Sequence, residues 1–186
     1  MVENDNIFNK VDALKKRMAE YAFVDGLQKK DMWSLAESNH ILDNIVNAWA
    51  YLLNVENKRR SPESSNRFFF TINAFVILCT DTYFHSKASL EERQEILFGI
   101  MKKEMKHAQV NTLEKVDLVF FPVVASGHYY LLCINFMKGS LELIDNRLLD
   151  NKISFVQKYK NHPRTLLRAF ATFYATFPLN KKQKYV

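Results

Sequence analysis

Glycine, proline and cysteine are scarce in this sequence, with four, four and two residues in a chain of 186. So little glycine and proline excludes collagen-like and low-complexity disordered chains, which are rich in those residues. Two cysteines cannot build a disulfide scaffold. Cys79 and Cys133 both lie in apolar runs, which favours reduced thiols and a place in the nucleus or cytoplasm.

Long hydrophobic runs are also missing. The longest apolar stretches, Phe68–Cys79 and Tyr129–Phe136, contain polar breaks or stop short of a bilayer span, so we expect no membrane association. The start of the chain, MVENDNIFNK, carries acidic residues and no apolar core, which argues against a secretory signal. With 48% hydrophobic and 25% charged residues, the composition is typical of a globular protein.

The net charge of +6 raises the possibility of a nucleic-acid partner. The basic residues, however, occur in small groups interspersed with acids, and no nucleic-acid-binding motif accompanies them. One such group, Lys58-Arg59-Arg60 before Ser61-Pro62, has the composition of a short nuclear-localisation patch. A basic, nucleic-acid-associated interaction domain is therefore kept only as a second alternative.

The first part of the chain predicts helices. Apolar residues at Ile41, Ile45, Trp49 and Leu52 form a helical stripe, and the polar stretch that follows predicts an exposed loop. Phe68–Cys79 is too short to assign by its period, so strand and buried helix stay open. Further on, an S-x-x-E capping box at Ser89 and Glu92 predicts the start of a second helix, which extends to Ala108.

The second part predicts strands. Three short apolar segments rich in β-branched or aromatic residues are Val116–Val124, Tyr129–Phe136 and Leu141–Asp145. Pro122 cannot donate to a strand ladder, so we expect it near a strand end. A last helix begins near Pro163, with Leu166, Phe170, Phe173 and Phe177 on its apolar face. Helices, then strands, then a helix indicate an α+β fold.

A histidine and an aspartate flank the predicted hairpin. A two-residue turn at Lys138-Gly139 would place Asp145 opposite Leu132, four residues from His128. His128 and Asp145 would then project from the same face and lie toward the same end of the hairpin. An aspartate beside a histidine fixes its tautomer and stabilises the imidazolium, as a general base requires. Cys133 faces the opposite way and is expected to be a buried structural thiol.

The segment VDLVFFPVVASGHYYLLCINFMKGSLELIDNR resembles the central part of the Ulp-type ubiquitin-like-protein proteases, which include the SUMO-processing enzymes. The likeness lies in Pro122 at the end of a hydrophobic strand, His128 followed by an aromatic residue, and Asp145-Asn146 ending the next hairpin strand. Tyr129 replaces the more common Trp. ILDNIVNAWAYLLN is similar to the family's early helix, so the resemblance spans roughly residues 32–177 and is strongest to plant, transposon-associated members.

The resemblance implies an α+β fold of the papain-like cysteine protease type, incomplete at its C-terminus. It implies a helical N-terminal part, a central, mostly antiparallel sheet and a C-terminal helix. Residues 1–31 would be an N-terminal helical extension, and residues 32–186 a partial protease domain without the Cys-bearing segment. His128 would be the general base, Asp145 its orienting carboxylate and Tyr129 a candidate wall of the substrate groove. The family's catalytic Cys and oxyanion Gln have no counterpart: no Cys follows Cys133, Gln157 lies too near Asp145, and no Asp-Cys-Gly follows Gln183.

The function implied by the resemblance is that of a cysteine-type peptidase or isopeptidase, a thiol protease. It would act on a SUMO-type ubiquitin-like modifier or its conjugates, without a cofactor or a metal. A His–Asp pair without a nucleophile cannot form the covalent intermediate, so the chain as given is expected to be inactive. Two interpretations stay open beside the nucleic-acid alternative: a truncated piece of an active protease, or a non-catalytic module that binds the modifier or another protein.

Overall fold

The computed structural model describes residues 31, 34, 41–79, 89–125, 127–147 and 153–177. Within these ranges the helices and strands follow the order α3 (Asp43–Asn57), β1 (Arg67–Phe69), α4 (Asn73–Cys79), α5 (Leu90–His107), β2 (Leu118–Ala125), β3 (His128–Asn135), β4 (Ser140–Ile144), α6 (Phe155–Tyr159) and α7 (His162–Thr176). None of these helices is long and apolar enough to cross a membrane. The predicted extension over residues 1–31 lies outside the described residues, apart from Asp31, and its boundary stays a prediction.

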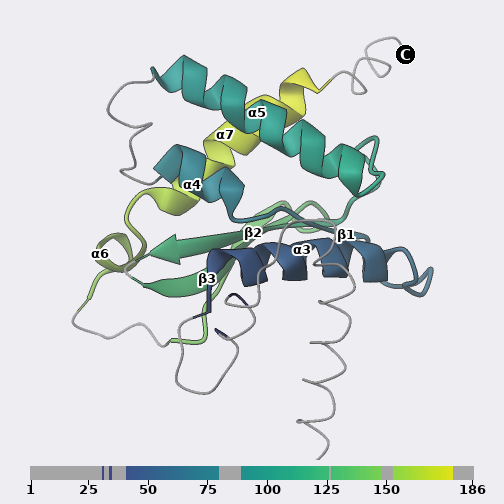
Figure 1. Cartoon of the computed structure of the whole chain (residues 1–186), viewed down its shortest axis with the longest axis horizontal. Coiled ribbons are helices and arrows are strands. Elements are labelled where there is room, and N and C mark those ends of the chain that lie inside the picture. Colours follow the sequence, from purple (N-terminus) through teal and green to yellow (C-terminus); the bar gives the residue numbers. More distant parts are fainter. Residues whose placement is uncertain are drawn as a thin grey trace, which may run out of the picture.

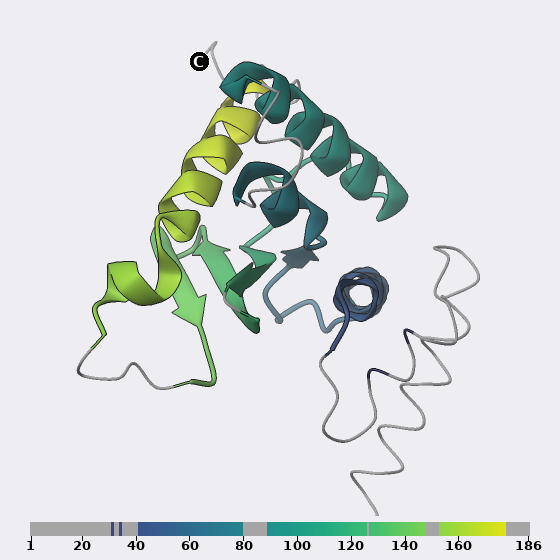
Figure 2. The same ribbon diagram turned by 60° about the vertical axis from the view of Figure 1, so that its left-hand side comes forward.

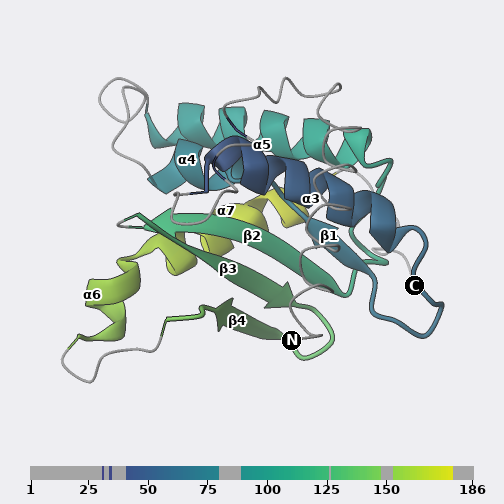
Figure 3. The same cartoon turned by 60° about the horizontal axis from the view of Figure 1, so that its bottom comes forward.

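The strands form a mixed sheet in the order β1-β2-β3-β4 (Figure 3). β1 pairs with β2 in parallel, and the other two pairs are antiparallel. The expected α+β arrangement with a mostly antiparallel sheet is therefore confirmed.

Three helices, α4, α5 and α7, lie together on one face of this sheet (Figures 1 and 2). Aromatic rings fill the space between them: Phe70 stacks on Phe121 with ring centroids 4.7 Å apart, and Phe170 of α7 meets both rings edge-on. Leu166 and Phe173 of α7 are buried in the same core. The apolar stripe predicted for the last helix thus faces the sheet as expected, and burial of its large side chains stabilises the fold by roughly 1.5–3 kcal/mol each.

Two local predictions concern the start of α5 and the segment Phe68–Cys79. The capping box is confirmed: Ser89 Oγ accepts a hydrogen bond from Glu92 N at 3.2 Å, and Glu92 Oε2 accepts one from Ser89 N at 2.7 Å. The ambiguous segment Phe68–Cys79 contains both candidate structures, since β1 ends at Phe69 and α4 begins at Asn73. At the corner between them, the carboxylate of Glu104 accepts hydrogen bonds from the backbone and the hydroxyl of Thr71.

Helix α3 covers the outer edge of β1 rather than the core face. Asn54 imitates a neighbouring strand: its Nδ2 donates to Phe69 O at 2.8 Å, and its Oδ1 accepts from Phe69 N at 2.9 Å. Asn57 Oδ1 accepts from Arg67 N at 3.1 Å in the same way. An open edge exposes unpaired backbone groups, and on this side the asparagines bond three of them, Arg67 N, Phe69 N and Phe69 O.

Pro122 lies inside β2, where it pairs with Leu131, so its expected place near a strand end is wrong. The reason lies in the short neighbouring strand. Leu118 N donates to Asn66 O and Phe120 O accepts from Phe70 N, so the backbone groups of alternate β2 residues face β1. The next residue of that set is Pro122, but β1 pairing stops at Phe120. The donor that proline lacks would therefore have no strand partner.

Candidate functional site

The hairpin β3–β4 brings the two candidate catalytic residues together by a register that differs from the expected one. Asn135 pairs with Ser140, so four residues form the turn instead of the two predicted. Gly139 adopts a positive φ of 61°, which favours glycine, and Asn135 Oδ1 accepts a hydrogen bond from Lys138 N. Because pairing reaches Leu131 and Ile144, Asp145 falls opposite Tyr130 and not Leu132. The error is an even number of residues, so the predicted shared face of His128 and Asp145 is preserved.

His128 and Asp145 are in direct contact. His128 Nε2 lies 2.6 Å from Asp145 Oδ1, and the two side chains are only 14% and 4% exposed. An ionised carboxylate can only accept, so the imidazole donates from Nε2. In the neutral ring, Nδ1 then keeps its lone pair and is the nitrogen able to take up a proton.

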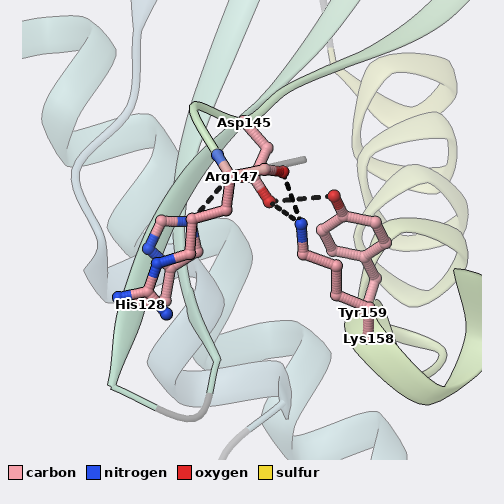
Figure 4. A network of polar contacts seen from close by, with 5 residues as sticks. All are labelled: His128, Asp145, Arg147, Lys158 and Tyr159. Atoms are coloured by element: carbon pink, nitrogen blue, oxygen red, sulfur yellow. Dashed lines mark hydrogen bonds and ion pairs between the residues drawn. The ribbon is translucent and has the colours of Figure 1, made fainter. Parts of the chain in front are cut away.

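The carboxylate of Asp145 has a donor for each of its lone pairs (Figure 4). Oδ1 accepts from His128 Nε2 and from Arg147 N at 2.8 Å, while Oδ2 accepts from Tyr159 OH at 2.8 Å and lies 3.0 Å from Lys158 Nζ. Burial alone raises the pKa of Asp145, but hydrogen bonds from Arg147, His128, Lys158 and Tyr159 outweigh it and hold the pKa well below its usual range. Asp145 is therefore ionised at neutral pH.

Lys158 and Tyr159 were not anticipated from the sequence. Both belong to α6, a helix of five residues, and Figure 4 shows their side chains reaching Asp145 from the side opposite His128. A signal for this helix is present: Ser154 and Gln157 form a capping box, with Ser154 Oγ accepting from Gln157 N and Gln157 Oε1 accepting from Ser154 N. That motif predicts a helix start, but it does not predict that the helix meets Asp145.

Tyr129, the candidate groove residue, lines a cavity of about 640 Å³ to which β2, β3 and the start of α3 contribute. Its hydroxyl lies 3.1 Å from Ile41 O and 2.5 Å from a carboxylate oxygen of Asp43, at the start of α3. The surroundings of the cavity are mostly apolar, with Pro122 and Val124 among its lining residues, and His128 at its border. Burial, the hydrogen bond to Asp43 and its negative charge raise the pKa of Tyr129, so the phenol stays protonated.

Neither cysteine has the surroundings of an activated nucleophile. Cys133 is 2% exposed, which confirms the predicted burial, and burial followed by the nearby charge of Glu142 raises its pKa. Burial raises the pKa of Cys79 to about 12, against an opposing effect of Arg93. Since the thiolate is the reactive form, both groups are poor nucleophiles at neutral pH.

Three basic side chains lie close together in the described residues. Lys58, Arg60 and Arg67 line a cavity of about 350 Å³ near the C-terminal ends of α3 and α5. Lys58 directly follows α3, where a cation offsets the partial negative charge of the free carbonyl groups, and its Nζ donates to Gln109 Oε1 at 3.0 Å. In the described ranges no group of three His, Cys, Asp or Glu residues is arranged to hold a metal ion.

Solved structures of a SUMO protease are similar to this fold. The chain is similar to the SUMO protease Ulp1 with its catalytic cysteine oxidised to a sulfinic acid, with a TM-score of 0.50 and 17% sequence identity. The match covers 82% of this chain and 57% of the Ulp1 chain, so it spans little more than half the length of that solved chain. The sulfonic acid form of Ulp1 matches with a TM-score of 0.48, also at 17% identity, over 82% of this chain and 58% of the other.

No protein-family model matches the sequence, and no curated protein sequence matches it. The structural likeness therefore defines the class at the level of fold. This is an α+β fold of the papain-like cysteine protease type, with the architecture of the SUMO protease Ulp1.

Proposed function

We propose that this chain is derived from a cysteine-type peptidase or isopeptidase of the Ulp type and engages a SUMO-type ubiquitin-like modifier. In this proposal His128 is the general base, Asp145 fixes and stabilises it, and Tyr129 forms a wall of the groove that receives the modifier's extended tail. The observation that carries the proposal is the 2.6 Å contact between His128 Nε2 and Asp145 Oδ1 beside an apolar groove, on a fold shared with a SUMO protease.

The chemistry of the pair supports this role. With its proton held on Nε2 by an ionised Asp145, His128 offers Nδ1 to a thiol, takes the proton and becomes an imidazolium beside the carboxylate. The thiolate formed would attack a carbonyl carbon. Because Cys79 and Cys133 both have raised pKa values, cleavage requires a cysteine that these 186 residues do not supply. The activity proposed for this chain by itself is therefore binding of the modifier.

The experiment is a titration of the chain with a SUMO-type modifier, followed by NMR or calorimetry. A modifier lacking its flexible C-terminal tail serves as the first control and should bind more weakly. Val124→Arg places a charged side chain in the groove and should weaken binding at least tenfold, whereas Val156→Arg, at an exposed position of α6, should not. Equal affinity of the two variants, or no binding by the parent chain, would refute the proposal.

A modifier carrying a C-terminal vinyl sulfone tests the catalytic part separately. We expect no covalent adduct with the chain, because the reaction needs a thiolate close to the modifier terminus. An adduct on Cys79 or Cys133 would show that one of them acts as a nucleophile and would overturn the binding-only assignment.

A further inference from the structure

Besides the histidine, the Asp145 carboxylate contacts a second side chain, and this one carries a positive charge. Its side chain is 4% exposed, and a buried carboxylate requires both hydrogen bonds and a compensating charge. A neutral His128 supplies a hydrogen bond but no charge. Lys158 supplies the charge, with Nζ at 3.0 Å from Oδ2, and its own side chain is only 17% exposed. The ion pair thus remains partly shielded from water, where it is stronger than a surface pair.

The lysine is itself held in place. Its Nζ donates to Arg147 O at 2.7 Å, two residues after Asp145, so one ammonium group bridges the carboxylate and the backbone that follows it. The next residue, Tyr159, is buried, and its ring meets Tyr130 edge-on with centroids 5.0 Å apart. Tyr130 follows His128 by two residues on the same strand. Helix α6 is therefore tied to both sides of the His128–Asp145 pair.

We propose that Lys158 and Tyr159 are positioning residues of the site: Lys158 neutralises the Asp145 carboxylate while His128 is uncharged, and Tyr159 fixes the orientation of that carboxylate. Together they hold the imidazole in the form with its proton on Nε2 and Nδ1 free. The general-base role of His128 rests on the proposed function. The positions of the protons on its ring can be tested without any modifier.

The charge balance around His128 gives the direction of the expected effect. Asp145 favours the imidazolium, whereas Lys158 on the far side of the carboxylate opposes it. Among the described residues, the other titratable or charged side chains facing this region are Arg147, Tyr129, Tyr130 and Tyr159, with Asp43 beyond Tyr129 and Cys79 beyond Tyr130. Without the ammonium group, the negative charge of Asp145 is no longer offset by a nearby positive charge, so the imidazolium of His128 becomes more stable.

The test is ¹⁵N NMR of the imidazole, which reports the protonated nitrogen and the pH midpoint of each ring. The His128 signals are assigned by their loss in His128→Gln. In Lys158→Met the His128 midpoint should rise by about one pH unit. Lys158→Arg should return it close to the parent value, and Lys102→Met, which removes an exposed lysine from α5, should leave it unchanged. A Lys158→Met midpoint equal to that of Lys102→Met would overturn the proposal.

Tyr159→Phe provides a second test that keeps the charge. It removes one donor to Oδ2 and should lower the fraction of neutral His128 with its proton on Nε2, with a smaller change in midpoint than Lys158→Met. Circular dichroism establishes that each variant is folded; if Lys158→Met does not fold, an unchanged tautomer in Tyr159→Phe overturns the proposal. Failure of the modifier to bind while the His128 midpoint responds as expected would instead contradict the proposed function alone.

Discussion

The hydroxyl of Tyr129 lies 3.1 Å from the carbonyl oxygen of Ile41, a residue 88 positions earlier in the chain. The contact joins the strand that carries His128 to the beginning of α3. It also orients the Tyr129 ring as a wall of the apolar groove. A tyrosine O–H has one proton, so it donates to Ile41 or to Asp43 at any moment.

Tyr129→Phe and Tyr129→Ala separate the effect of the hydroxyl on stability from the effect of the ring on binding. Phenylalanine keeps the wall and loses the hydrogen bond, so the free energy of unfolding should fall by about 1 kcal/mol with little change in affinity for a modifier. Alanine also removes the ring and should weaken binding about tenfold. Urea unfolding and calorimetry measure the two effects. The same loss of affinity in both variants would mean that the hydroxyl, and not the ring, supports binding.

Asp145→Asn should make the free energy of unfolding less dependent on pH in the acid range. The pKa of Asp145 is lower in the folded chain than its value of about 3.9 in an unfolded one, so its contribution is fully present above that value. The contribution is lost as pH falls below about 4 toward the folded pKa. We therefore expect Asp145→Asn to be less stable than the parent at pH 7 and the difference to shrink in acid.

Urea midpoints between pH 7 and pH 2 measure this dependence. Glu114→Gln, at an exposed position, is the matched control and should run parallel to the parent over the whole range. A difference between Asp145→Asn and the parent that stays constant with pH would contradict the ionised state assigned to the buried carboxylate.

Asn54→Ala tests the attachment of α3 to the sheet. The side chain makes two hydrogen bonds to the backbone of Phe69, and its loss leaves a donor and an acceptor without partners at the strand edge. We expect a loss of about 1–3 kcal/mol for each group that stays buried and unsatisfied. Asn111→Ala, at an exposed site, should change the free energy of unfolding by less than about 0.5 kcal/mol. Similar losses in both variants would argue against the role of Asn54.

The two thiols should react slowly in the folded protein. With a pKa of about 12, Cys79 has roughly 10⁻⁵ of its thiol ionised at pH 7, and Cys133 is buried. Alkylation by iodoacetamide, followed by mass spectrometry, should therefore be much slower in buffer than in denaturant. Fast modification of Cys79 in the folded chain, at a rate near that of free glutathione, would mark it as a reactive thiol.

The sequence was informative where a feature depends on neighbouring residues. The capping box at Ser89 and the apolar periods of α3, α5 and α7 are local, and the predicted helices are present. The strand pattern placed His128 and Asp145 on one face despite the wrong turn length, because side-chain direction depends only on whether the offset is even. The turn itself could not be assigned from Lys138-Gly139 alone, since Asn135 and the positive φ of Gly139 together favour the longer form.

The features that the sequence did not predict depend on contacts between distant segments. Phe68–Cys79 was ambiguous because its apolar residues serve a strand and a helix in succession. Lys158 and Tyr159 follow Asp145 on a separate short helix, and nothing in the intervening sequence specifies that α6 returns to the carboxylate. For the same reason the sequence predicts the contact between His128 and Asp145 but not the one with Lys158, whose Nζ lies 3.0 Å from Asp145 Oδ2.

The asparagines of α3 make the two edges of the sheet differ in their free backbone groups. Asn54 and Asn57 bond Phe69 N, Phe69 O and Arg67 N on the outer side of β1, so these three groups are not open to an incoming strand. At the opposite border, β4 pairs only with β3 among the described residues, and its Leu141 and Ile144 are exposed. In the described part of the chain, a further strand, from the same polypeptide or from a second one, would therefore pair more readily along β4 than along β1.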